Sequence, residues 1–102
     1  MKVFITGASS GIGEALAVYY AAQGATLGLA ARRSEFLDGL NTRLGGGHAC
    51  YPLDVTDAPA LHAAAVDFIE RFGAPDVVIA NAGVSAGTLT EYEEDLAVFR
   101  RV

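Results

Sequence analysis

The stretch Thr6-Gly7-Ala8-Ser9-Ser10-Gly11-Ile12-Gly13 decides the fold. A compact apolar run, Val3-Phe4-Ile5-Thr6, precedes it, and a segment of helical period follows it. In this setting Gly7 permits a tight exit from a strand and Gly11 lets backbone approach a diphosphate without a Cβ in the way, while Gly13 allows close helix packing. We therefore predict a strand, a glycine turn and a helix whose N-terminal amides can bind phosphate.

The two serines of this turn, Ser9 and Ser10, are candidate hydrogen-bond donors to the same diphosphate. Serines at a helix start also serve as N-caps, and the whole turn could be a cap without a ligand, so both interpretations stay open. The glycine spacing, G-x-x-x-G-x-G, differs from the G-x-G-x-x-G of two-domain dehydrogenases and lacks the Gly-Lys pair of a P-loop. An ATPase is therefore excluded by the missing lysine.

Beyond the turn, short β-branched runs alternate with longer segments of helical period, which is the pattern of βαβ units. We expect strands at residues 3–6, 26–30, 48–51 and 77–80. We expect helices from residue 11 to Gly24, from a cap at Ser34 to the glycines at 45–47, and from a cap at Asp57 to Gly73, with a last helix opening at Thr90 and Glu93. The predicted fold class is α/β, a Rossmann-type doubly wound parallel sheet of about four strands with helices on both faces.

Apolar residues at helical spacing define the faces that should pack on this sheet. The predicted faces are Ile12, Leu16 and Tyr19 in the first helix, Phe36, Leu40 and Leu44 in the second, Leu61, Ala65, Phe68 and Phe72 in the third, and Tyr92, Leu96 and Phe99 in the last. Tyr19, Tyr51 and Tyr92 are accordingly predicted to be packing residues. The run at 77–80 is apolar on both faces, as in a parallel strand covered by helices on each side.

Length and composition limit the remaining possibilities. With 102 residues and 52% apolar content, the chain has the size of one domain, residues 1–102. Its 7 basic and 12 acidic residues give a charge of -5, which argues against nucleic acid as a partner. The single cysteine, Cys50, suits a reducing compartment, and polar residues interrupt the first twenty positions, so we expect a cytoplasmic protein without a membrane segment. His48, His62 and Cys50 lack metal-ligand spacing, so no metal site is expected.

Three motifs occur in order, namely T-G-A-S-S-G-I-G, Asp54-Val55 and Asn81-Ala82-Gly83, and together they resemble the short-chain dehydrogenase/reductase family. The resemblance covers the entire chain and matches the N-terminal part of that family. It implies a Rossmann fold, a nicotinamide dinucleotide cofactor and hydride transfer between a carbonyl and an alcohol. It also implies that Asp54 bonds the adenine amino group, that the Val55 backbone meets the ring, and that the Asn81 turn supports the adenosine ribose. An Asx turn at Asp54 and a purely structural turn at Asn81 are the alternatives.

The choice of cofactor depends on the end of the second strand, where an acid would hold the ribose 2'-hydroxyl of NAD. This chain has Arg32 and Arg33 there, and a guanidinium can bind a 2'-phosphate through charge-assisted hydrogen bonds. NADP(H) is therefore favoured over NAD(H), although either arginine could simply be solvated. The candidate cofactor-binding residues are Gly7, Ser9, Ser10, Gly11, Ile12, Gly13, Arg32, Arg33, Asp54, Val55, Asn81, Ala82 and Gly83.

The resemblance also implies a catalytic Tyr-x-x-x-Lys pair and a serine, and this chain lacks the pair. The residues four after its tyrosines are Gln23, Gly24, Val55 and Leu96, and Lys2 is the only lysine. We therefore expect no catalytic residue here, and predict the N-terminal cofactor-binding part of an NADP(H)-dependent oxidoreductase whose parent acts on a small carbonyl or alcohol substrate.

The apolar run at 77–80 would form an open sheet edge, which favours association, so we expect a homo-oligomer. The alternatives to the enzyme are a non-catalytic nucleotide-binding or scaffold module completed by a partner chain, and an inert fragment.

Overall fold

The computed structural model describes residues 1–8 and 11–80, and in them strands and helices alternate along the chain. The elements are β1 (Lys2–Thr6), α1 (Gly11–Ala22), β2 (Thr26–Ala31), α2 (Ser34–Arg43), β3 (Ala49–Pro52), α3 (Ala58–Phe72) and β4 (Val77–Ala80). The helix expected after Thr90 lies outside the described residues.

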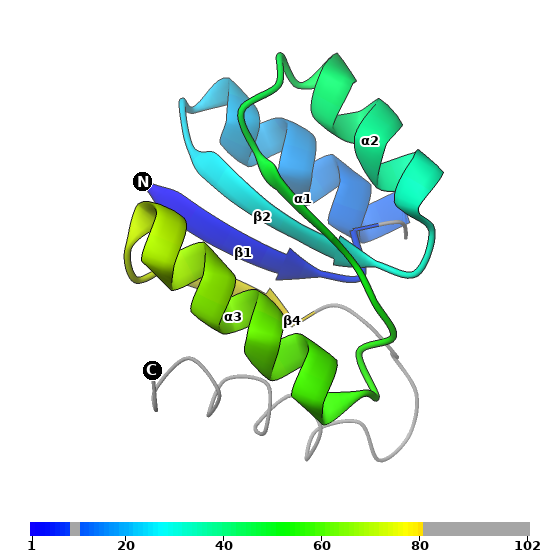
Figure 1. Ribbon diagram of the computed structural model, residues 1–102. Coiled ribbons are helices and arrows are strands. Elements are labelled where there is room, and N and C mark those ends of the chain that lie inside the picture. Colours follow the sequence, from blue (N-terminus) through cyan, green and yellow to red (C-terminus); the bar gives the residue numbers. More distant parts are fainter. Residues whose placement is uncertain (9–10, 81–102) are drawn as a thin grey trace.

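All described strands lie in one parallel sheet with the order β3-β2-β1-β4. Ile5 in β1 lies opposite Leu29 of β2 and Ile79 of β4, so the first strand is central. Helices α1 and α2 cover one face of the sheet and α3 covers the other (Figure 1). The predicted α/β fold class, a Rossmann-type sheet with helices on both faces, is confirmed.

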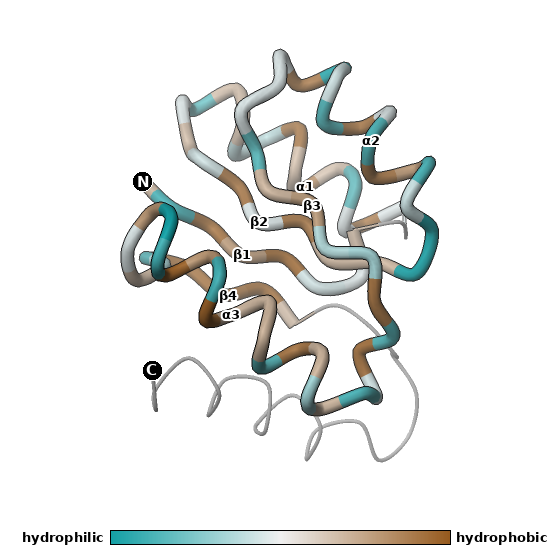
Figure 2. The backbone as a smooth tube through the Cα atoms, viewed as in Figure 1, coloured by the Kyte–Doolittle hydropathy of each residue, from teal (hydrophilic) through white to brown (hydrophobic). Residues whose placement is uncertain are grey.

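The core consists of two layers because successive strand residues point to opposite faces of a sheet. Val3 and Ile5 belong to the layer under α1 and α2, whereas Phe4 belongs to the layer under α3. Figure 2 shows the apolar residues concentrated along β1 and β4, with hydrophilic residues on the turns and outer helix surfaces. β1 is therefore packed on both faces, against α1 and α2 on one side and against α3 on the other.

The layer under α3 is built from aromatic rings. The Phe4 ring lies 5.5 Å from the Phe68 ring, edge to face, and 5.7 Å from the Tyr51 ring, stacked. Gly28 of β2 makes room for these rings, since a Cβ there would stand 2.6 Å from Phe4 Cδ2 and 2.8 Å from Phe68 Cδ1. The stacking on Phe4 confirms the packing role predicted for Tyr51, and the Tyr51 hydroxyl donates to Asp67 Oδ2 at 2.6 Å.

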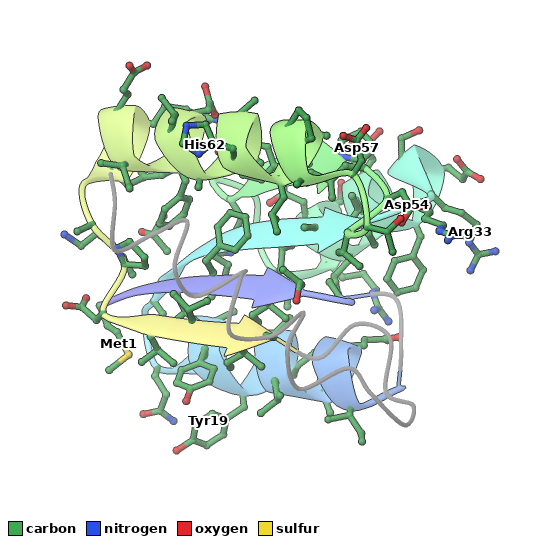
Figure 3. All side chains as sticks on the ribbon, turned by 90° about the horizontal axis from the view of Figure 1, so that it is seen from below. Met1, Tyr19, Arg33, Asp54, Asp57 and His62 are labelled. Carbon is green, nitrogen blue, oxygen red and sulfur yellow. The ribbon has the colours of Figure 1, made fainter. Side chains whose placement is uncertain are left out.

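Helix α1 packs mainly through a different face from the predicted one, of which only Leu16 is partly buried against the core. Ile12 and Tyr19 are 66% and 57% exposed, and Figure 3 shows Tyr19 pointing away from the sheet. The buried residues are instead Gly13 and Ala17, with Tyr20 partly buried against the same core layer. The prediction was wrong for Ile12 and Tyr19 because α1 has apolar residues around most of its circumference, so several stripes satisfy the helical period. The smallest residues face the sheet, which lets the helix approach closely.

Helix α2 begins one residue earlier than a Ser34 cap requires. Arg33 is the N-cap, with extended backbone and no capping hydrogen bond from its side chain, and Ser34 is already helical. The predicted face is confirmed for Leu40, which is buried, but the sequence analysis missed the fully buried Leu37. Phe36 and Leu44 are partly buried against the same layer.

Helix α3 follows the prediction closely. Asp57 caps it by accepting a hydrogen bond from the Ala60 backbone N–H at 3.2 Å, and Gly73 ends it. Its buried residues include Leu61, Ala65 and Phe68 of the predicted face, with Phe72 partly buried beside them. In the part of the chain that the structure describes, no helix has the length and apolar character needed to cross a membrane.

The third strand starts one residue later than expected because His48 contacts β2 through its side chain and not through its backbone. Its Nδ1 accepts the Leu27 backbone N–H at 3.0 Å, while its own backbone N–H donates to Asn41 Oδ1 at 3.2 Å. Ladder pairing then begins at Ala49, opposite Gly28. An Nδ1 that accepts a hydrogen bond belongs to a neutral imidazole.

This contact predicts a stability that depends on His48 protonation. Burial lowers the pKa of His48 below its ordinary value of 6.5, against an opposing hydrogen bond to the Leu44 backbone. The unfolded chain therefore binds more protons than the folded chain below about pH 6.5, and the stability present above that pH is lost as the pH falls, by at most about 1.4 kcal/mol per pH unit for one proton. Urea unfolding of the wild type and His48→Gln, from pH 7.5 to 5.5, should show a steeper loss in the wild type.

His62→Gln is the matched control, because His62 is exposed on α3. It should keep the wild-type pH dependence. Parallel stability curves for the wild type and His48→Gln would contradict the assignment.

Candidate nucleotide-binding site

Those predicted cofactor residues that the structure describes gather at one end of the sheet, where the parallel strands end. The Gly7 turn follows β1, Arg32 follows β2 and Asp54 follows β3 by two residues, and these strands are neighbours. Ligands of open parallel sheets bind outside the carboxyl ends of the strands. Figure 3 shows Arg33 and Asp54 together at this end, beyond the tips of the strand arrows.

The glycine turn is fastened to the neighbouring strand. Gly7 has a φ of 73°, a left-handed conformation that favours glycine, and its N–H donates to the Ala30 carbonyl at 2.9 Å. The Ala8 N–H donates to the same carbonyl at 3.1 Å. On the other side, the buried Thr6 hydroxyl donates to the Ile79 carbonyl of β4 at 3.4 Å. The exit from β1 is therefore tied to both neighbouring strands.

The close packing predicted for Gly13 is confirmed. A Cβ at this position would stand 2.1 Å from the Gly7 carbonyl oxygen and 3.0 Å from Ala8 Cα, so α1 rests directly on the turn. At Gly11, the first residue of α1, a Cβ would meet no atom within 4 Å. The two glycines thus differ: one faces the turn, and the other leaves open space at the helix N-terminus. The phosphate-binding roles of Gly11 and the exposed Ile12 stay predictions.

Arg32 and Asp54 form an ion pair across the ends of β2 and β3. The Arg32 guanidinium donates through Nη2 to Asp54 Oδ2 at 2.9 Å, and the two side chains are 76% and 41% exposed. An ion pair this exposed contributes little to stability. From the sequence, separate roles are predicted for the two residues, and their contact is not. The adjacency of the two strand ends is the signal that could have suggested it.

Thr56 holds the other oxygen of this carboxylate. Its backbone N–H and hydroxyl both donate to Asp54 Oδ1, at 2.9 and 2.7 Å, which is the Asx turn considered as an alternative for Asp54. These two hydrogen bonds are the main cause of the lowered pKa of Asp54, and Arg32 adds to the effect. Asp54 is therefore a carboxylate near neutral pH. The proposed contacts of Asp54 and Val55 with adenine stay predictions, as does any role for Thr56, which the sequence analysis did not single out.

Arg33 has a different environment from Arg32. Its guanidinium carbon lies 5.9 Å from the centroid of the Phe36 ring, a cation–π contact within α2 and its cap. The structure thus brings Arg32, and not Arg33, to Asp54. Ser9, Ser10, Asn81, Ala82 and Gly83 lie outside the described residues, so their predicted roles are unchanged.

Cys50 and Tyr51, two other side chains considered for chemistry, make contacts within the fold. Burial raises the pKa of the Cys50 thiol, which lies 3.5 Å from the Leu37 carbonyl oxygen. Burial and the bond to Asp67 also raise the pKa of Tyr51, so its hydroxyl keeps its proton. Within residues 1–8 and 11–80, no group of three or more His, Cys, Asp or Glu side chains is placed to hold a metal ion.

Comparison with known proteins agrees with this geometry. Residues 1–102 match the family described as short chain dehydrogenase. A Dichelobacter nodosus protein named "probable NADP-dependent dehydrogenase" is 41% identical over 97 residues, covering 95% of this chain and 92% of its own length. The mouse dehydrogenase/reductase SDR family member 7 is 38% identical over 109 residues, covering all of this chain but 32% of its own length.

Solved structures share the fold. A short-chain dehydrogenase/reductase mutant of Serratia marcescens superposes with a TM-score of 0.87 at 22% identity, covering 98% of this chain and 49% of that one. An actinorhodin polyketide ketoreductase solved with NADPH gives a TM-score of 0.85 at 25% identity, covering 96% and 45%. The chain therefore spans about half of the solved relatives and a third of the mouse protein. With its family match over the full length and its Rossmann-type sheet, this chain belongs to the short-chain dehydrogenase family.

Proposed function

We propose that this chain is the cofactor-binding part of an NADP(H)-dependent oxidoreductase that interconverts a carbonyl and an alcohol by hydride transfer. The observation that carries the proposal is the position of Arg32, exposed at the end of β2, beside a glycine turn fastened to that same strand. Family membership supports the oxidoreductase, and a relative named as NADP-dependent and a neighbour solved with NADPH support the phosphorylated cofactor.

The residues present fit a phosphorylated dinucleotide. The open space at Gly11 allows a diphosphate to reach the N-terminal amides of α1, where backbone N–H groups and the helix dipole favour an anion. The residue at the end of β2 is Arg32, and not the acid that would hold the ribose 2'-hydroxyl of NAD and repel a 2'-phosphate. The guanidinium, 76% exposed, can donate charge-assisted hydrogen bonds to that group.

When bound, the nicotinamide would supply the hydride chemistry, and this chain would bind and orient the dinucleotide. Proton transfer to a substrate belongs elsewhere in our proposal, since the sequence has no Tyr-x-x-x-Lys and the Tyr51 hydroxyl is bonded to Asp67. The parent protein would then supply the substrate pocket. The single cysteine and the apolar fourth strand favour a cytoplasmic homo-oligomer as its setting.

Titration of the full chain with NADPH and NADH, followed by calorimetry, tests the proposal. We expect NADPH to bind more tightly by roughly ten- to 150-fold, because one charge-assisted hydrogen bond contributes about 1.5 to 3 kcal/mol. A folded sample that binds neither dinucleotide at millimolar concentration would overturn the proposal. Equal affinities would leave dinucleotide binding in place and remove the preference for NADP(H).

A further inference from the structure

We propose that Thr56 is a positioning residue for cofactor selection, acting through Asp54 to hold the Arg32 guanidinium ready for the 2'-phosphate. The inference rests on the proposed function and extends it to a residue that would not touch the cofactor. It begins from a continuous chain of contacts, in which Thr56 donates to Asp54 and Arg32 donates to the same carboxylate.

Thr56 fixes the rotation of the Asp54 carboxylate. Two donors from one residue, the backbone N–H at 2.9 Å and the hydroxyl at 2.7 Å, hold Oδ1 in place. With Oδ1 occupied on the turn side, Oδ2 is directed at Arg32 Nη2, 2.9 Å away. The turn is itself anchored, because the Asp57 N–H donates to the Asp54 carbonyl at 2.9 Å and Asp57 caps α3. These contacts connect Arg32, through Asp54, to the N-terminus of α3.

The ion pair leaves both partners able to bind a ligand. A carboxylate offers about four acceptor sites, of which these contacts fill three, so Oδ2 can still accept from an adenine amino group. Arg32 uses a single N–H in the pair, and its other N–H groups remain for a phosphate. The 76% exposure of its side chain leaves that part of the guanidinium open to solvent.

Holding Arg32 in place should strengthen binding of the 2'-phosphate. A long side chain that is ordered only on binding costs about 0.5–1.5 kcal/mol, and a side chain already held avoids that cost. Removing the restraint should therefore weaken NADPH binding by about 2- to 13-fold. Changing Asp54 itself would be ambiguous, since losing its negative charge also strengthens the attraction between Arg32 and phosphate. Thr56 carries no charge, so its substitution isolates the positioning effect.

The experiment compares Thr56→Val with Thr56→Ser in the full chain by measuring dissociation constants for NADPH and NADH. Any effect on adenine is common to both cofactors and cancels in their ratio. Thr56→Val removes the hydroxyl donor and keeps the backbone N–H donor, so we expect it to lower the preference for NADPH toward the lower end of that range, about 2-fold. Thr56→Ser, which keeps the hydroxyl, should retain the preference. In carbon-detected NMR of the cofactor-free chain, the Asp54 pKa should rise in Thr56→Val and stay low in Thr56→Ser.

An unchanged preference in Thr56→Val, or an equal loss for both cofactors, would overturn the positioning role while leaving dinucleotide binding intact. A wild-type chain that binds NADPH no better than NADH would instead overturn the proposed cofactor choice, and the positioning role with it. The NMR titration distinguishes this case, because it reports the Thr56–Asp54 contact without any cofactor.

Discussion

Gly13→Ala is expected to lower the unfolding temperature substantially and to abolish tight dinucleotide binding. The new Cβ would stand 2.1 Å from the Gly7 carbonyl oxygen, and backbone atoms, unlike a flexible side-chain end, cannot move aside alone. Either α1 or the turn must shift. Overpacking of this kind costs about 1–3 kcal/mol, and each kcal/mol lowers the midpoint by about 4–8 °C in a domain near this size, so we expect a loss of about 4 to 24 °C in calorimetry.

Gly11→Ala is the matched control, because it adds the same methyl group two residues earlier in the same helix. Its Cβ meets nothing within 4 Å, and Gly11 is not among the glycines with positive φ. We expect the stability of this variant to be unchanged or raised by about 0.4–1 kcal/mol. NADPH binding should nevertheless weaken, since the methyl group would occupy the space where the diphosphate approaches. Equal thermal losses in the two variants would contradict the assigned contact between α1 and the turn.

Arg32→Glu should produce the largest change in cofactor preference. It removes the hydrogen-bond donors for a 2'-phosphate and places a carboxylate there, which repels that phosphate and can accept from a ribose hydroxyl. NADPH affinity should fall by at least about tenfold, and by about 150-fold if a bond of 3 kcal/mol is lost, whereas NADH affinity should change little. Dissociation constants for both cofactors provide the measurement.

Arg33→Glu makes the same charge change one residue later. The Arg33 guanidinium lies over Phe36, whereas Asp54 pairs with Arg32, so the loss of NADPH affinity should be clearly smaller than in Arg32→Glu. Similar losses in the two variants would show that overall charge, and not the position of Arg32, sets the preference. Equal losses of NADPH and NADH affinity in Arg32→Glu would refute the 2'-phosphate assignment.

The elements that sequence reasoning predicted well are those with strong local signals. Asp57, the apolar residues of α3 and Gly73 define a start, a buried face and an end, and each is observed. In α1 the sequence offers several apolar stripes, and the choice of face depends on the contact of Gly13 with the Gly7 turn, which is not a local property. His48 presents the same difficulty, because its imidazole takes the place of a backbone partner for Leu27 on the neighbouring strand β2.

At the candidate site, the positions of Arg32 and Asp54 could be predicted from the sequence, but the contact between them could not. Arg32 and Asp54 stand out in the sequence because of where their strands end, but their pairing depends on the order of β2 and β3 in the sheet. Thr56 was missed because a threonine in a turn has many structural uses. The role that we propose for it follows from two hydrogen bonds to one oxygen that only the folded chain reveals.

The Ala30 carbonyl, which accepts from both Gly7 and Ala8, belongs to β2 and lies two residues before Arg32, which follows the strand. The carboxyl end of β2 therefore sets the distance between the place proposed for the diphosphate and the place proposed for the ribose phosphate. A ligand whose two phosphate groups match that spacing would meet both at once. One with a shorter or longer separation would have to give up one of them.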